Sequence, residues 1–201
     1  MTAQPSKPVK PQVAIDGRRM RSETSRVRIV EAMIALVREG HTLPGAEAVA
    51  ARAGVGLRTV FRLFEDMDGV YRGMQEVLGE EIWALLDGPI AETDWRAAVA
   101  VLIVRRARAY EAMLPLQIAA DAQRHRSLAL REGRARLVRT QRDMLLPVLP
   151  AAVVADPLRL DALDLALSFE AWRRLRTDQG ADSVHAQAVM TMMAMTLIGD
   201  G

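Results

Sequence analysis

The residues best suited to specific chemistry lie between 45 and 64, in the stretch GAEAVAARAGVGLRTVFRLF. Two short helix-compatible segments, 46–52 and 56–63, flank the turn-forming triplet Ala53-Gly54-Val55. Helices joined in this way are typical of a helix-turn-helix, whose second helix enters the major groove of DNA. That second helix would offer its first N–H groups to phosphate and its outer side chains to the groove, at Gly56, Leu57, Arg58, Thr59, Phe61 and Arg62.

Arg58 is the candidate for reading bases, because a bidentate guanidinium contact to guanine is the commonest specific contact in the major groove. A phosphate clamp is an equally good interpretation of Arg58. Arg62 lies one turn further on and is expected to contact phosphate. Two helices with a glycine turn can also simply pack in a bundle, so the pattern alone leaves that alternative open.

The same stretch resembles the DNA-binding domain of TetR-family transcriptional regulators. The resemblance rests on Val49-Ala50, Ala53-Gly54-Val55, Thr59-Val60-Phe61 and Phe64. In that family, the helices that follow bind a small effector and form the dimer. The resemblance therefore implies a homodimeric, ligand-responsive repressor of a palindromic DNA operator, with Thr59 at a phosphate or thymine-methyl contact. It also implies that the effector moves the helix over 66–86 and changes the separation of the two recognition helices.

Several positions depart from the family pattern. Gly45 and Gly56 stand where polar helix caps are usual, Phe61 replaces a tyrosine, and Met67 replaces a lysine. Because that tyrosine and lysine typically contact phosphate, we expect either a weaker operator complex or compensation by Arg58, Arg62 and the basic arm. Binding should in either case depend on salt concentration. The departures also support an alternative, a helical small-molecule-binding or interaction protein whose helix-turn-helix no longer binds DNA.

The elements that must position these residues all show helical patterns. Apolar side chains recur at three- and four-residue steps from Ser22 to Gly40, and no segment alternates between apolar and polar residues. Further helices are expected over 66–86, 93–113 (capped by Thr93 and ended by Pro115), 116–146, 156–177 and 182–198. The sequence predicts an all-α fold of about nine helices, with a helix-turn-helix domain over 22–66 and an effector-binding and dimerisation domain over 67–201.

Residues 1–21 are expected to form a disordered basic arm, because Pro5, Pro8 and Pro11 block helix formation. Residues 1–62 carry 11 Lys/Arg against 5 Asp/Glu, whereas residues 63–201 carry 16 against 20. The positive excess fits a polyanionic partner, although most of it lies in the arm. The arm can enter a minor groove through Arg18, Arg19 and Arg21, and a solvated tail is the alternative.

The C-terminal two thirds of the chain carry less specific signals. Five large side chains could surround an effector cavity, with ordinary core packing as the alternative: Trp83, Tyr110, Met113, Phe169 and Trp172. The segments 158–175 and 184–198 are apolar on more than one face, so we expect the homodimer to form through these last two helices. The arginines between 124 and 142 are expected to form a solvated face, and a site for an anionic effector is the alternative.

Composition excludes several classes of protein. The chain has no cysteine and only three widely spaced histidines, so neither a thiolate site nor a histidine-based metal centre is expected. It lacks a glycine-rich phosphate loop and a nucleophile elbow, so we expect no enzyme and no cofactor. No apolar run has the length of a signal peptide or a membrane span, which predicts a cytoplasmic protein without a membrane partner.

Overall fold

The computed structural model describes residues 13–42 and 44–199, and every regular element among them is helical. The expected all-α fold of about nine helices is therefore confirmed. The elements are α1 (Val13–Arg38), α2 (Ala46–Ala53), α3 (Leu57–Phe64), α4 (Met67–Leu86), α5 (Trp95–Gln123), α6 (Leu128–Leu145), the 3-10 turn η1 (Leu146–Val148), α7 (Ala151–Val154), α8 (Pro157–Ala166), α9 (Phe169–Arg173), the π-helical turn η2 (Arg174–Asp178) and α10 (Ser183–Ile198).

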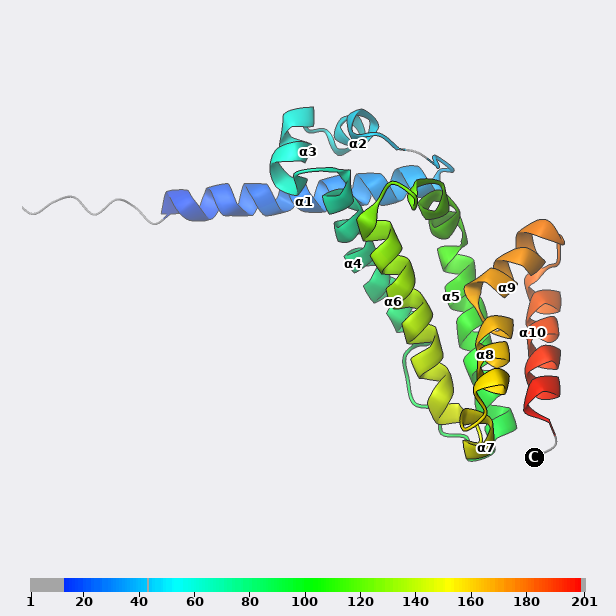
Figure 1. Ribbon diagram of the computed structural model, residues 1–201. Helices are drawn as coiled ribbons and strands as arrows, with labels where there is room; N and C mark the ends of the chain where they lie inside the picture. The colour runs from blue at the N-terminus through cyan, green and yellow to red at the C-terminus, as the bar shows by residue number, and fades with distance from the viewer. Residues whose placement is uncertain (1–12, 43, 200–201) are drawn as a thin grey trace, which may run out of the picture.

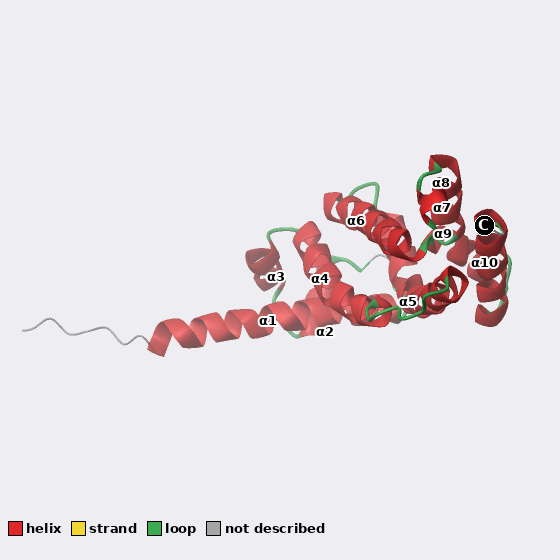
Figure 2. Ribbon diagram, turned by 90° about the horizontal axis from the view of Figure 1, so that it is seen from below, coloured by secondary structure: helices red, strands yellow, loops and turns green. Residues whose placement is uncertain are grey.

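The helices form an elongated molecule with two distinct ends (Figures 1 and 2). α2 and α3 lie on α1 at one end, and α8 and α10 lie side by side at the other. Between them run α4, α5 and α6, which pack against one another. These three packed helices therefore join the two ends of the molecule.

Within the described residues, no helix is both long and apolar enough to cross a membrane.

α1 begins at Val13, so the expectation that residues up to 21 form a disordered arm is wrong for 13–21. The last proline of this region is Pro11, and Gly17, which costs about 1 kcal/mol relative to alanine, is the one helix-disfavouring glycine between Val13 and Arg21. A helix whose C-terminal half is fixed by packing can extend toward its N-terminus at one hydrogen bond per added residue. Residues 1–12 lie outside the described part of the chain.

α5 differs from its predicted form at both ends. Asp94, not Thr93, is its N-cap, and its carboxylate accepts a hydrogen bond from the Ala97 N–H at 3.1 Å. The helix also continues through Pro115 to Gln123 instead of ending near 113. A proline inside a helix costs about 3 kcal/mol. Here Met113 and Leu116, on either side of Pro115, are buried in the two cores, which favours an uninterrupted helix.

The single helix predicted over 156–177 is split between α8 and α9. The Ala171 N–H, which in a continuous helix would bond the Leu167 carbonyl, instead donates to the Ser168 hydroxyl at 3.2 Å. The freed Leu167 carbonyl accepts hydrogen bonds from Tyr110 at 2.8 Å and from Arg106 at 3.0 Å. Contacts from α5 thus stabilise a break that the local sequence does not indicate.

Two hydrophobic cores divide the fold. One combines α1–α4 with the end of α5 and the beginning of α6, and the other joins most of α5 to the elements from η1 to α10. The first core includes Val70, Met74 and Leu78 of α4. Packing therefore continues across the predicted domain boundary at residue 66. A movement of α4 must also displace side chains of α1, α2 and α3, which share this core.

Candidate nucleic-acid interface and ligand cavity

The turn between α2 and α3 has the geometry that its sequence predicts. Gly54 ends α2 in the left-handed conformation, with φ of 64°, which a side chain disfavours. Its N–H bonds the last carbonyls of α2, and the Val55 N–H donates to the Ala50 carbonyl at 3.0 Å. Val49 and Val60 are completely buried between the helices. The buried side of α3, with Val60 and Phe64, thus packs against α2, α1 and α4.

The other face of α3 is open to solvent. Arg58 and Arg62 are exposed and have no hydrogen-bond or ion-pair partner among the described residues. Leu57 is 37% and Phe61 42% exposed, and the two apolar side chains lie one helical turn apart on this face. Thr59 is half-buried. The structure thus places the predicted groove-facing residues on one surface, with Thr59 at its margin.

The departures from the family pattern have structural counterparts. Gly45 and Gly56 are the N-caps of α2 and α3, and neither helix has a side-chain cap. The first N–H groups of α3 are therefore not bonded by a cap side chain. Met67 is half-buried against the first core. Met67 therefore contributes to packing, at the position where the sequence comparison above expects a lysine.

Arg26 of α1 supports α3 and was not predicted from the sequence. Its guanidinium donates to the Leu63 carbonyl and lies 4.4 Å from the centre of the Phe64 ring. It bonds a carbonyl in the last turn of α3 and holds that helix on α1. Only a positive charge on α1 could have indicated this role, because the partners lie 37 residues apart in the sequence.

α4 begins directly against the end of α3. The Asp66 carboxylate caps α4 by accepting from the Gly69 N–H at 2.8 Å. A Cβ on Gly69 would collide with the Phe64 carbonyl oxygen, so this approach requires glycine. α3 cannot move independently of the first turn of α4.

The same turn of α4 also holds α6. The Asp68 carboxylate accepts from the N–H groups of Leu128 at 3.0 Å and Ala129 at 3.1 Å. Desolvation opposes ionisation, but hydrogen bonds from Ser127 and these N–H groups outweigh it and lower the pKa of Asp68. A charged Asp68 at the N-terminus of α6 is also favoured by the helix dipole.

The predicted arm residues fall partly within α1. Arg19 and Arg21 are exposed on the helix, which projects beyond the rest of the molecule in Figure 1. The side chain of Arg18 lies outside the described residues. The positive charges of Arg19 and Arg21 therefore lie on a helix and not on a disordered arm.

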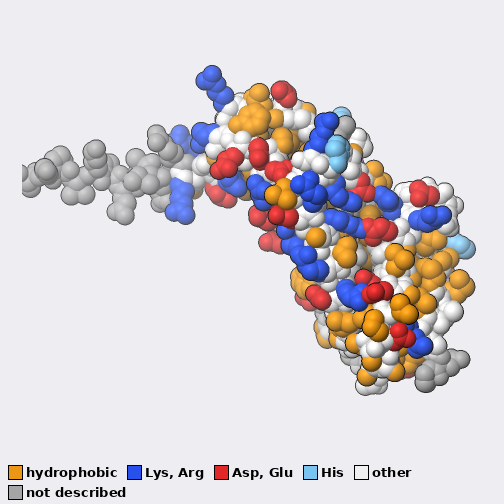
Figure 3. Space-filling view, viewed as in Figure 1, with side chains coloured by type: hydrophobic (Ala, Val, Ile, Leu, Met, Phe, Trp, Pro, Cys, Tyr) orange, Lys and Arg blue, Asp and Glu red, His pale blue; other side chains and the backbone are white. Residues whose placement is uncertain are grey.

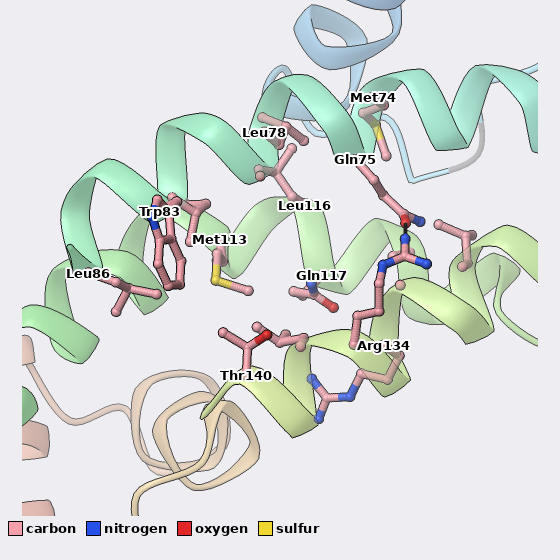
Figure 4. Close-up of a pocket in the computed structure, with 17 residues that line it drawn as sticks. Met74, Gln75, Leu78, Trp83, Leu86, Met113, Leu116, Gln117, Arg134 and Thr140 are labelled. Carbon is pink, nitrogen blue, oxygen red and sulfur yellow. Dashed lines mark hydrogen bonds between the residues drawn. The ribbon is translucent and has the colours of Figure 1, made fainter. Parts of the chain in front are cut away.

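A cavity of about 320 Å³ lies between α4, α5 and α6 (Figure 4). Trp83 and Met113 line it, as two of the five predicted ligand-binding side chains. Most of the lining is apolar, and its polar members come from all three helices. Its lining comprises Met74, Gln75, Leu78, Gly79, Ile82, Trp83, Leu86, Met113, Leu116, Gln117, Ala120, Leu130, Gly133, Arg134, Arg136, Leu137 and Thr140.

The other three predicted ligand-binding residues, Tyr110, Phe169 and Trp172, lie in the second core instead. Tyr110 packs edge-on against Phe169, with ring centres 5.6 Å apart, and also meets Trp172. Burial raises the pKa of Tyr110 to about 12. Their structural role follows from this packing, because aromatic rings from α5 and α9 bury one another and leave no face for a ligand.

The arginines of α6 do not all form a solvated face. Arg134 is half-buried and pairs with Glu170 of α9. Arg142 pairs with Asp161 at 2.6 Å and Asp164 at 3.5 Å, both on α8. These ion pairs link α6 to the C-terminal helices.

No protein-family model and no curated protein matches this chain. Within 13–42 and 44–199, no three His, Cys, Asp or Glu side chains are grouped so that they could hold a metal ion. The features of the molecule that bear on its function are the exposed face of α3, the cavity and the contacts that link them.

Proposed function

We propose that this protein is a ligand-responsive transcriptional repressor of the TetR type, which binds a palindromic DNA operator as a homodimer. The observation that carries the proposal is the exposed face of α3. There, Arg58 and Arg62 have no partner within 13–42 and 44–199, while Val60 and Phe64 are buried and anchor the helix from behind. A helix held in this way can enter a major groove without losing its packing.

The opposite end of the molecule supports the proposed dimer. Large apolar side chains of α8 and α10 are exposed there: Leu158 (84%), Leu165 (69%), Val184 (77%) and Met192 (62%). Figure 3 shows hydrophobic side chains gathered toward this end. A two-fold axis through these helices would bury them and set two copies of α3 on the same side of the dimer.

The proposed ligand response follows from the path between the cavity and α3. α4 lines the cavity along its length, and its first turn touches Phe64 and holds the start of α6 through Asp68. A ligand that separates α4 from α6 therefore shifts the helix on which α3 rests. A coupling of about 1–3 kcal/mol is enough to lower operator occupancy several-fold or more.

Selection of genomic DNA fragments by the full chain at low salt tests the proposal, with a palindromic sequence as the expected product. Arg58→Ala should weaken binding to that sequence and relax its base preference. Arg62→Ala should weaken binding to all sequences and lower the salt slope by about one. Arg139→Ala, on the exposed side of α6, is the matched control and should bind like the wild type.

The alternative is a helical small-molecule-binding or interaction protein that no longer binds DNA. The uncapped starts of α2 and α3 and the half-buried Met67 favour it. The same selection separates the two functions. Absence of palindromic enrichment at low salt, or binding that does not depend on salt, would support the alternative.

A further inference from the structure

The cavity opens to solvent through a slot between α4 and α6. Gln75, Gly79 and Trp83 line both the cavity and a surface groove, and they recur every four residues along one face of α4. Arg136 of α6 is also common to the cavity and the groove. The eight residue-to-residue steps from Gln75 to Trp83 along α4 make this slot about 12 Å long.

The two ends of the cavity differ in chemistry. Figure 4 shows Trp83, Leu86 and Met113 toward one end and Gln75 toward the other. Arg136 belongs to the Gln75 end, because it donates a hydrogen bond to the Gln75 Oε1 at 2.8 Å. The cavity is therefore amphipathic, with an apolar end and a cationic end.

Gln75 is fixed in a position that orients Arg136. Its Nε2 donates to the Ala129 carbonyl of α6 at 3.1 Å. A Cβ on Gly133 would collide with the Gln75 side chain, so the glycine leaves the space that this amide occupies. Gln75 thus bridges α4 and α6 and holds one guanidinium nitrogen of Arg136, leaving its other N–H groups for a ligand.

The charges of the lining have one sign. Arg134 and Arg136 are its ionisable members, and no Asp or Glu lines the cavity. Arg134 is already paired with Glu170, whereas no carboxylate pairs with Arg136 among the described residues. The groove outside adds charges of both signs, from Arg72, Glu76 and Glu80. Inside the slot, an anion gains a charge-assisted hydrogen bond and a cation gains none.

We propose that the cavity binds an apolar monocarboxylate that lies along the slot, with its carboxylate on Arg136 and its apolar body against Trp83, Met113 and Leu86. This inference rests on the proposed function in taking the cavity as the effector site. A cavity of about 320 Å³ is at the small end of the range for small-molecule sites. An extended eight-carbon chain is about 9 Å long and fits the slot.

Calorimetric titration of the full chain with octanoate, octanol and octylamine tests the charge preference. Octanoate should bind about tenfold or more tightly than octylamine. Arg136→Gln should weaken octanoate binding about tenfold and leave octanol binding unchanged. Arg136→Lys should retain part of the octanoate affinity, because it keeps the charge and loses the planar guanidinium. Arg139→Gln, on the same helix but outside the cavity, should bind all three probes like the wild type.

Octanoate should also change the tryptophan fluorescence, and Trp83→Phe should remove most of that change because Trp83 alone among the three tryptophans lines the cavity. Octylamine binding as tightly as octanoate, equal octanoate affinity in Arg136→Gln and wild type, or no saturable octanoate binding would each overturn the inference. Operator binding is measured separately. Octanoate that binds through Arg136 without affecting any DNA complex would uphold the ligand assignment and count against the proposed regulator.

Discussion

Glu111 of α5 offers a sharp test of how the C-terminal helices are held. Its carboxylate accepts hydrogen bonds from the Trp172 indole Nε1 at 2.8 Å and from Arg176 at 2.7 Å (Nε) and 3.0 Å (Nη2). Trp172 is completely buried in the second core. We predict that Glu111→Ala destabilises the protein mainly through the indole N–H that it leaves without an acceptor.

The magnitude follows from the burial of the two donors. An unsatisfied buried donor costs about 1–3 kcal/mol, and this sets the expected loss in Glu111→Ala. Arg176 reaches solvent, so water replaces the carboxylate there and adds little to the loss. Glu111→Gln keeps an oxygen for the indole and should cost about 1 kcal/mol or less.

The contribution of Glu111 also depends on pH. Hydrogen bonds from Arg176 outweigh desolvation and, with the Trp172 bond, lower the pKa of Glu111 below its ordinary value of 4.5. A lowered pKa in the folded state gives stability that is fully present above pH 4.5 and is lost as the pH falls through the folded-state pKa. The stability difference between wild type and Glu111→Gln should therefore shrink below pH 4.5.

Urea unfolding at one fixed protein concentration, followed by circular dichroism, measures these differences at pH 7 and across the acid range. Glu132→Ala on the exposed side of α6 is the control and should remain within about 0.5 kcal/mol of the wild type. The reasoning is refuted if Glu111→Ala is as stable as that control, or if the Glu111→Gln difference is the same on both sides of pH 4.5.

Three further changes test the proposed DNA-binding face of α3, the proposed dimer interface and the link between α4 and α6. Phe61→Tyr adds a hydroxyl on the exposed face of α3 and should tighten operator binding about two- to tenfold in fluorescence anisotropy; an unchanged affinity would count against a phosphate contact at this position. Leu165→Glu places a charge on the exposed apolar surface of α8 and should yield monomers in sedimentation analysis, whereas an intact dimer would exclude this surface as the interface. Asp68→Ala removes the acceptor for Leu128 and Ala129 and should cost about 1–2 kcal/mol in urea unfolding, and a neutral effect would show that the Ser127 cap suffices.

The starts of α4, α8 and α10 were predictable, because one short side chain caps each of them, whereas α5 starts at Asp94 instead of Thr93 and the start of α9 at Ser168 was not expected. Asp66, Asp156 and Asp182 each accept a hydrogen bond from an N–H two or three residues later, as their sequence positions indicate. Such caps depend on neighbouring residues alone. The continuation of α5 through Pro115 and the break before α9 were not predicted, because each depends on contacts made by distant residues.

Some features of the candidate site were likewise predictable from the local sequence, and others depend on contacts between distant residues. The turn at Gly54 and the outward face of α3 follow from local pattern, and the structure reproduces both. Neither the support of α3 by Arg26 nor the bridge from Gln75 to α6 has a local signal, since each joins segments far apart in the sequence.

The sequence by itself determined the all-helical fold, the helix-turn-helix geometry and the basic character of the N-terminal third. Only the tertiary structure decided that Trp83 and Met113 line the cavity while Tyr110, Phe169 and Trp172 fill the core. All five are large apolar side chains on helices, and their local patterns are alike. The arrangement of α4, α5 and α6 decides which of these side chains pack against a neighbour and which line the cavity. Packing between residues tens of positions apart in the sequence sets this arrangement.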